Sequence, residues 1–364
     1  MRNNPYQDLS PSHFWGRAIA KSTALVPEEL YKRKWPIGKG EKIATAGSCF
    51  AQHIGRHLKR NGFHVLDMEP PPLGLTLEEQ KKFGFSMYSA RYGNIYTTRQ
   101  LLQLAKEAFG EWVPGEVVWE GKNGGYYDAI RPGVEPEGLG SAAEVMAHRK
   151  YHLECVREMF ETMDLFIFTL GLTEAWMHAA TGTVFPTAPG TIAGLYDPGI
   201  YKFKNFLFDE VREDFNAFKK LVHSKQKQPN KAKFLLTVSP VPLTATASAN
   251  HVLLATTYSK SVLRAVAGQL AMHQPEIDYF PSYEIISNPW SKTLLYEANL
   301  RSVKEVGVEA VMQTFFKAHL LENAAIVSST TSNAVFSVQN KSEIKDYSND
   351  VICEEAILDA FSKE

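Results

Sequence analysis

The feature that most constrains the fold is a continuous apolar run over residues 164–170, which reads DLFIFTL and stops at Gly171. A strand that is apolar on both faces is typical of the centre of a parallel sheet, where helices cover each side. Parallel strands need crossover connections, and these are usually helices. The run therefore predicts an α/β protein rather than an all-β or all-helical one.

The segment 42–67 has the pattern of a β-turn-α-β unit. Residues 42–47 are short and apolar and stop at Gly47. Phe50, Ile54 and Leu58 then recur every four residues, which is helical spacing. An Asn-Gly pair follows, and residues 63–67 read as the next strand. The unit predicts the first part of a parallel sheet.

The rest of the chain continues this alternation. Further strands are expected at 233–238 and 277–280, and helices at 97–109, 141–162, 207–224, 256–273, 303–319 and 351–361. A hairpin insertion is expected at 115–140 and an irregular, functional loop at 175–206. The alternation predicts a doubly wound α/β sandwich, with ligands at the carboxyl ends of the strands.

We expect one main domain over residues 41–320, with insertions at about 68–140 and 175–206. An arm of residues 1–40 precedes it, and a partly mobile tail of residues 321–364 follows. The length of 364 residues allows two domains but fits one α/β domain with insertions equally well.

The composition excludes several classes of partner. The net charge is −1, from 39 basic and 40 acidic side chains, so neither nucleic acid nor an anionic membrane is favoured. There is no run of about 18 apolar residues and no signal-peptide pattern, so we expect no membrane span. Three widely spaced cysteines show no zinc spacing, and we expect a cytoplasmic protein without metal. Nucleotide motifs are absent too, and no cofactor is expected.

The first turn, at residues 47–51, is the strongest candidate for chemistry. Ser48 and Cys49 follow a strand and open a helix, where free N–H groups and the helix dipole stabilise a thiolate or an oxyanion. Gly47 permits the tight turn. The alternative is structural, with Ser48 as a helix cap and Cys49 as a small buried side chain.

Other polar residues also follow predicted strands. Gly171 and Thr173 could donate to an oxyanion, and Glu174 could bind a substrate hydroxyl or orient a base. Acyl transfer through Ser or Cys needs a base, and His251 is the best candidate, with Glu284 to orient it. The pairs His53/His57 and His148/His152 have helical spacing, but solvent-exposed faces explain them better than metal sites.

The turn Gly-Ser-Cys-Phe-Ala resembles the signature of the GSCFA family. Similar segments follow in order over roughly residues 40–320: 91–96 (RYGNIY), 171–176 (GLTEAW), 239–241 (SPV) and 281–284 (PSYE). This family looks like a branch of the SGNH/GDSL hydrolases, which are mostly esterases and carbohydrate O-acyltransferases or deacetylases. The resemblance implies a flavodoxin-like three-layer α/β/α sandwich with a parallel sheet.

The resemblance also implies roles for individual residues. Gly47, Ser48 and Cys49 match the superfamily's Gly-Asp-Ser block, which places Cys49 at the nucleophile position; a shift of one residue restores Ser48. Gly93 and Asn94 match the block that supplies an oxyanion glycine. Gly171, Thr173 and Glu174 match the Gly-x-Asn-Asp/Glu block, with Thr173 in place of the asparagine.

One departure from the superfamily pattern is large. Its last block, Asp-x-x-His, has no counterpart, because residues 284–316 contain no histidine. Arg301 stands near that position; it is a poor base but could hold an anionic group.

Three functions follow from these observations. The first is a hydrolase or O-acyltransferase for a small-molecule or carbohydrate ester, with an acyl donor in the transfer case. The second is a ligand-binding protein that keeps the fold but lacks the catalytic histidine. The third, a redox role for Cys49, is disfavoured because no resolving cysteine is near it in sequence. The sequence specifies neither the substrate nor the oligomeric state.

Overall fold

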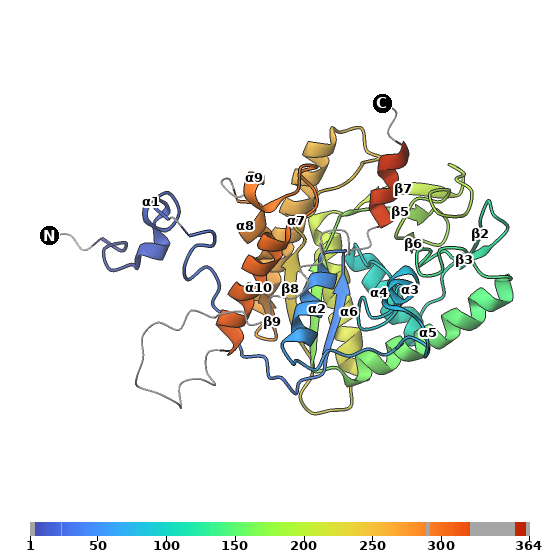
Figure 1. Cartoon of the computed structure of the whole chain (residues 1–364), viewed down its shortest axis with the longest axis horizontal. Helices are drawn as coiled ribbons and strands as arrows, with labels where there is room; N and C mark the ends of the chain where they lie inside the picture. The colour runs from blue at the N-terminus through green and yellow to red at the C-terminus, as the bar shows by residue number, and fades with distance from the viewer. Residues whose placement is uncertain (1–3, 23, 289–291, 321–353, 362–364) are drawn as a thin grey trace. The chain divides into compact units, whose positions relative to one another are not determined.

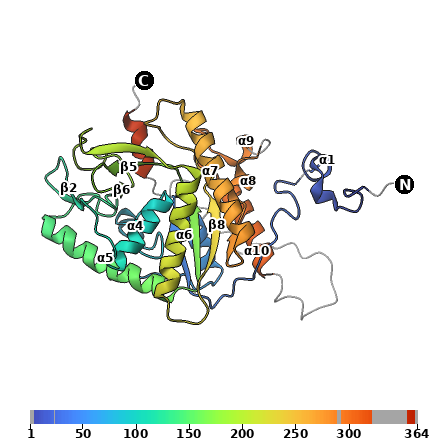
Figure 2. The same cartoon turned by 180° about the vertical axis from the view of Figure 1, so that it is seen from behind.

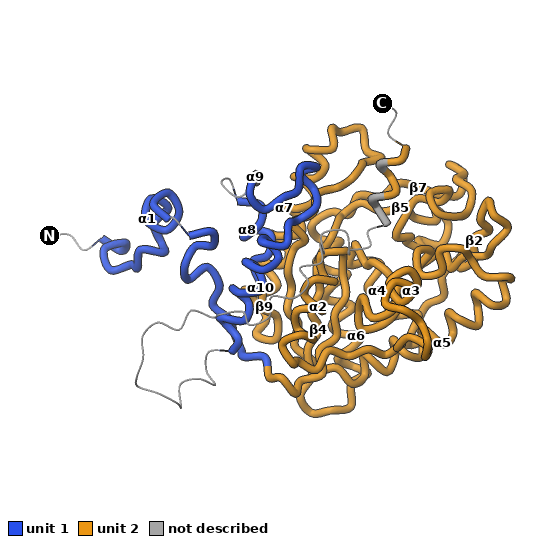
Figure 3. The backbone as a smooth tube through the Cα atoms, in the orientation of Figure 1, with its two compact units in different colours: residues 1–37, 280–350 blue, residues 38–279, 351–364 orange. Residues whose placement is uncertain are grey.

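The computed structural model describes residues 4–22, 24–288, 292–320 and 354–361. The chain divides into two compact units (Figure 3). One comprises Met1–Ile37 with Phe280–Asp350, and the other Gly38–Tyr279 with Val351–Glu364. We call them unit 1 and unit 2. The domain boundaries expected from the sequence stay predictions.

Unit 2 contains the parallel sheet. Its strands are β1 (Ile43–Gly47), β4 (Leu165–Leu170), β8 (Lys233–Val238) and β9 (Ile277–Tyr279), in the order β1-β4-β8-β9. All the neighbouring pairs are parallel. The strand predicted at 63–67 is reduced to a single parallel bridge between Ile43 and Val65. If the bridged segment at Val65 is counted as the second strand, the spatial order of the strands is 2-1-3-4-5, as in flavodoxin. The strand order reverses direction between β1 and β4, and this place is the switch point of the sheet.

Helices cover both faces of this sheet. On one face lies α2 (Ala51–Arg60); on the other lie α4 (Thr98–Ala108), α6 (Phe208–Lys225) and α7 (Val252–His273) (Figures 1 and 2). The long α5 (Ala142–Thr162) packs against α4. The predicted three-layer α/β/α sandwich is confirmed.

Phenylalanines fill the interface between the sheet and α6. Phe166 of β4 and Phe234 of β8 are fully buried, and Phe218 of α6 lies between them, with ring centroids 5.4 and 6.1 Å away. Every residue of β1 and β4 is buried. The two strands that end at the predicted site are therefore held rigidly by packing on both faces.

The two insertions form a second, smaller β layer. The hairpin expected at 115–140 is present as β2 (Val118–Glu120) and β3 (Tyr126–Asp128). The prediction that 175–206 is irregular is wrong. This part of the chain forms the antiparallel sheet β6-β5-β7, with β5 at Glu174–His178, β6 at Val184–Phe185 and β7 at Tyr201–Asn205. Its glycines and prolines lie in the connections, and its aromatic residues pack with Trp119 of the hairpin into one core.

The remaining elements are short, apart from α10. Unit 2 also contains α3 (Leu77–Lys82) and the 3₁₀ helix η3 (Glu354–Phe361), where a short helix was expected. Unit 1 contains η1 (Pro11–His13), α1 (Trp15–Ala18), α8 (Ser282–Ile286), α9 (Lys292–Leu295) and α10 (Glu305–Leu320). Within the described parts of the chain, no helix combines the length and apolarity needed to cross a bilayer.

A close backbone approach fixes the end of β1 against β4. Gly47 pairs with Thr169 and has φ +138°, a conformation that side chains rarely adopt. A Cβ at this position would lie 2.7 Å from the Thr169 nitrogen. The two strands can therefore meet at the switch point only with glycine here.

Replacing Gly47 by alanine should lower the free energy of unfolding by about 3 kcal/mol, because both the backbone angle and the contact with Thr169 become unfavourable. Urea denaturation would measure the loss. Gly182→Ala is the matched control: Gly182 also has positive φ (+71°), but no atom lies within 4 Å of the added Cβ. It should cost only about 1 kcal/mol. Equal losses in the two variants would contradict the close-approach argument.

Candidate functional site

The turn after β1 lies at the switch point of the sheet. The Ser48 N–H donates to the Thr169 carbonyl oxygen at 3.1 Å, and the Ser48 carbonyl accepts from the Ala51 N–H at 2.8 Å. Cys49 follows and is 5% exposed. Ser48 does not cap the helix, because the N-cap position of α2 is Phe50 and no side chain caps it. The turn therefore presents its helix N-terminus without a side-chain cap.

The Ser48 hydroxyl is enclosed. Ser48 is 3% exposed, and its Oγ has no hydrogen-bond partner among the described residues. A Cβ on Gly171 would lie 3.0 Å from the Ser48 Cβ, so the turns after β1 and β4 touch at this point. An unpaired buried hydroxyl costs free energy. Packing alone therefore does not explain why a hydroxyl group is present at this position.

The segment containing Gly93 and Asn94 links these two turns. Gly93 has φ +67°, and two residues later the Ile95 N–H donates to the Gly47 carbonyl at 2.9 Å. Asn94 Oδ1 accepts from the Tyr88 hydroxyl at 2.6 Å. The structure thus brings this segment beside the turn. The oxyanion role of Gly93 and Asn94 stays a prediction.

The backbone N–H groups at and after Gly171 already have hydrogen-bond acceptors within the protein. The N–H groups of Gly171 and Leu172 both donate to the Tyr96 carbonyl, at 3.1 and 3.0 Å. The N–H of Thr173 donates to Ser259 Oγ at 3.0 Å. The Thr173 hydroxyl, in contrast, is buried and has no partner among the described residues. Of the donors predicted after β4, the Thr173 side chain is the one that remains available.

Sequence reasoning missed Lys260. This lysine of α7 is 2% exposed, and its ammonium donates to the Gly171 carbonyl oxygen at 2.7 Å. Its position was detectable, because Leu263 and Ala267 follow it at helical spacing and both are buried. A buried lysine is rare unless it is paired or functional. The structure therefore places a basic group against the residue that contacts Ser48.

His251, the predicted base, is the N-cap of α7. It is exposed, and its Nδ1 accepts from the Leu253 N–H at 3.2 Å. At a rise of about 1.5 Å per residue, it lies roughly 13 Å along the helix from Lys260. The structure gives His251 a capping contact at the start of α7.

Glu174 is the first residue of β5, next to the turn after β4, and is buried. Its carboxylate accepts from Thr246 Oγ1 at 2.9 Å, and burial raises its pKa. It lines a small cavity of about 70 Å³ together with Leu172, Trp176 and Leu358 of η3. A carboxyl group with a raised pKa beside a cavity can both donate to and accept from a ligand hydroxyl.

Glu284 and Arg301 belong to unit 1. Glu284 is in the first turn of α8, and Arg301 lies in a turn where its N–H donates to Asn299 Oδ1 at 2.9 Å. Their predicted roles as base-orienting acid and anion ligand stay predictions.

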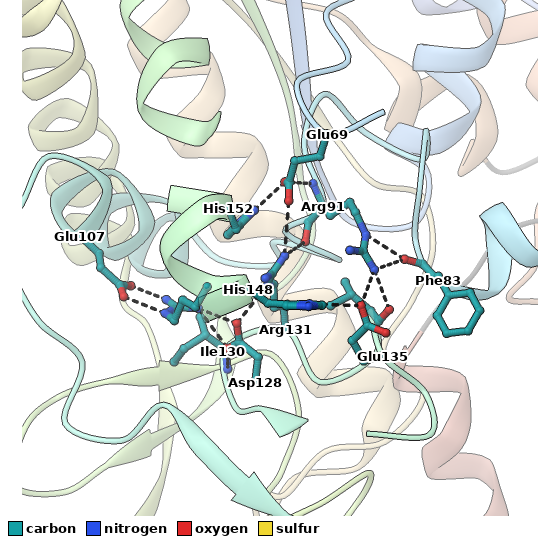
Figure 4. Close-up of polar contacts among 12 residues, drawn as sticks. Glu69, Phe83, Arg91, Glu107, Asp128, Ile130, Arg131, Glu135, His148 and His152 are labelled. Atoms are coloured by element: carbon teal, nitrogen blue, oxygen red, sulfur yellow. Dashed lines mark hydrogen bonds and ion pairs between the residues drawn. The ribbon is translucent and has the colours of Figure 1, made fainter. Parts of the chain in front are cut away.

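The solvent-exposed interpretation of the second histidine pair is wrong for His152. His152 is 1% exposed, and its Nδ1 lies 2.6 Å from a Glu69 oxygen (Figure 4). Its partner in the pair, His148, remains half exposed. Val145, Val156 and Met159 are buried on the same face of α5, so helical spacing could have identified the burial of His152.

This histidine is one member of a buried ionic network. Arg131 bonds to Asp128 at 2.8 Å and lies 3.8 Å from Glu69, while Arg149 joins Asp128 to Glu107 (Figure 4). Burial would raise the pKa of Glu69, but His152, Arg131 and the Arg91 N–H lower it to about 2. Burial and Arg131 lower the pKa of His152 to about 4, against the opposing effect of Glu69. At neutral pH the carboxylate is therefore ionised and the imidazole neutral.

In the described parts of the chain, no group of three His, Cys, Asp or Glu side chains is arranged to hold a metal ion. Two of the three cysteines, Cys49 and Cys155, lie in the described residues; both are buried and neither forms a disulfide.

Comparison with known proteins identifies one family. The model of the GSCFA family matches residues 42–315. No curated protein and no solved structure matches the chain. The matched region begins at β1, contains the Gly47–Ala51 turn and extends to α10, so it covers most of the chain. The chain belongs to the GSCFA family.

Proposed function

We propose that the protein is an ester hydrolase or O-acyltransferase that works through a covalent acyl-enzyme on Cys49. The supporting observation is the position of the Ser48–Cys49 turn at the switch point, beside Gly171, whose carbonyl oxygen accepts from Lys260. Open α/β sheets bind ligands at this point. The family's resemblance to SGNH hydrolases points to the same chemistry, with a carbohydrate ester as one candidate substrate.

Cys49 is the better nucleophile of the pair. The Ser48 Oγ has essentially no exposed surface, so an ester carbonyl cannot reach it in this conformation. Cys49 occupies the position that the family pattern gives to the nucleophile. It also lies at the uncapped N-terminus of α2, where the helix dipole favours the thiolate.

Lys260 takes the place of the missing histidine in this proposal. Lysine replaces histidine as the base in Ser–Lys variants of the catalytic triad. In its neutral form Lys260 accepts the Cys49 thiol proton as sulfur attacks the ester carbonyl carbon. The carbon–oxygen bond breaks, and the alkoxide takes the proton from Lys260. Water or a hydroxyl acceptor then attacks the thioester carbon and transfers its proton to Lys260. The carbon–sulfur bond breaks, and the departing Cys49 thiolate takes that proton from Lys260, which restores the thiol and the neutral amine.

The positions of the Thr173 hydroxyl and the Asn94 side chain suit the stabilisation of the oxyanion that develops in this reaction. Thr173 Oγ1 is a buried donor without a partner among the described residues, on the turn beside Ser48. Asn94 is held by Tyr88, whose hydroxyl also lies 3.2 Å from the Ser48 carbonyl oxygen. Hydrogen-bond donors that are fixed in advance lower the cost of a developing oxyanion.

A non-catalytic ligand-binding protein is the second candidate. The observation that favours it is the capping role of His251, the predicted base, whose Nδ1 accepts from the Leu253 N–H at the start of α7. It predicts binding without turnover.

Intact mass spectrometry after incubation with p-nitrophenyl acetate tests the proposal. We expect a single acetyl adduct that is lost in Cys49→Ala and kept in Ser48→Ala, because sulfur attacks. Cys155→Ala is the matched control, since Cys155 is also buried and forms no disulfide. Digestion and peptide mapping would locate the adduct. An adduct lost only in Ser48→Ala would move the nucleophile by one residue. No adduct and no p-nitrophenol release would favour the binding protein.

Removing the Lys260 amine should slow turnover by about 100-fold or more, because general base catalysis contributes on that scale. Lys260→Met keeps the length of the side chain and removes the amine. The comparison variant is His251→Asn, which retains the capping oxygen of α7. The rate of p-nitrophenol release would be measured for both. A large loss in His251→Asn with little loss in Lys260→Met would make His251 the base and overturn the lysine assignment.

A further inference from the structure

A second cavity lies away from the nucleophile turn, over the ionic network of Figure 4. Its volume is about 580 Å³, within the range of ligand pockets, which run from about 300 to 1,000 Å³. Glu69, Arg91, Arg131 and Glu135 supply its ionic groups, and Phe83 and Tyr151 supply apolar surface.

The ionic groups of this cavity balance one another. Arg91 pairs with Glu135 at 2.8 Å, and Arg131 lies 3.8 Å from Glu69. Each arginine therefore already has a carboxylate partner. A ligand with a net charge would leave one buried charge without compensation, which is costly. The cavity therefore suits a neutral ligand.

The arginines are held in fixed orientations. Arg91 donates through Nε and Nη2 to the Phe83 carbonyl, and Nη2 also reaches the Val134 carbonyl at 3.0 Å. Arg131 donates through Nε to Asp128 and through Nη1 to the Arg91 carbonyl at 3.0 Å. Arg91 Nη1 and Arg131 Nη2 make no hydrogen bond to the described residues. Each therefore offers donors in a rigid guanidinium plane.

Acceptors and flat apolar surfaces lie beside these donors. Glu135 uses Oε1 for its pairs with both Arg91 and His148, and among the described residues these pairs leave Oε2 as an acceptor. The guanidinium of Arg91 stacks on Phe85, 3.9 Å from the ring centroid. Tyr151, 57% exposed, stands at the rim. Fixed donors, fixed acceptors and aromatic faces match a ligand that carries many hydroxyls on an apolar frame.

We propose that this cavity binds a neutral carbohydrate. Sugar hydroxyls can both accept from the arginines and donate to Glu135, while the C–H face of the ring packs on an aromatic side chain. The proposal does not depend on acyl transfer at Cys49, because the cavity and the Ser48 turn share no lining residue. A sugar bound here would be a second ligand or a remote part of a longer glycan.

Saturation-transfer NMR on the full-length protein tests this proposal. The probes are glucose, galactose, mannose and N-acetylglucosamine, with glucuronate and glucosamine as charged comparisons. We expect at least one neutral sugar to bind and the charged analogues to bind more weakly. Tyr151→Ala and Glu135→Gln should each weaken binding about tenfold, because they remove a contact surface and an acceptor charge.

Two control variants test whether sugar binding depends on this cavity. Tyr258→Ala removes a tyrosine of α7 that is 40% exposed and outside the cavity, and it should leave sugar binding unchanged. Cys49→Ala should also leave binding unchanged, whether or not the acyl-enzyme exists. The proposal is overturned if none of the neutral sugars binds, if glucuronate or glucosamine binds more tightly than they do, or if the cavity variants bind as well as wild type.

Discussion

The approach of Gly47 to the Thr169 backbone is the contact on which the candidate site depends. It closes the distance between β1 and β4 at the switch point, where a side chain would not fit. The turns after the two strands consequently touch through Ser48 and Gly171. The segment ending at Tyr96 then bonds to both, since Ile95 donates to Gly47 and Tyr96 accepts from Gly171. A wider gap would separate the nucleophile turn from Thr173.

The same segment joins the two proposed sites. Arg91 lines the second cavity, and Asn94, three residues later, is held beside the nucleophile turn by Tyr88. Tyr92, between them, is buried, and its ring centroid lies 6.3 Å from that of His152. Burying so many charges is costly unless each is paired. Here Asp128 contacts Arg131 and Arg149, while Glu69 contacts Arg131 and bonds to the neutral imidazole of His152, so each buried carboxylate has partners.

The sequence predicted the main sheet well because its strands are apolar and end at glycine or proline. β4 and β8 lie within one residue of the expected bounds. The antiparallel strands at 174–205 were missed because their polar and aromatic residues alternate weakly and pairing partners are distant in sequence. The burial of Lys260 and His152 cannot be inferred from residue type, because charged and polar side chains are usually exposed. Their helical spacing with buried residues indicated the reverse.

The reactivity of Cys49 tests the central claim most directly, since an activated nucleophile must react faster than an ordinary buried thiol. The measurement is the rate of alkylation by iodoacetamide of the native protein at neutral pH, followed by peptide mapping. Cys155 is the internal reference, because it is similarly buried and its pKa is raised. Cys49 should react at least about tenfold faster than Cys155 if it is the activated nucleophile. Equal rates, or slower reaction at Cys49, would contradict it.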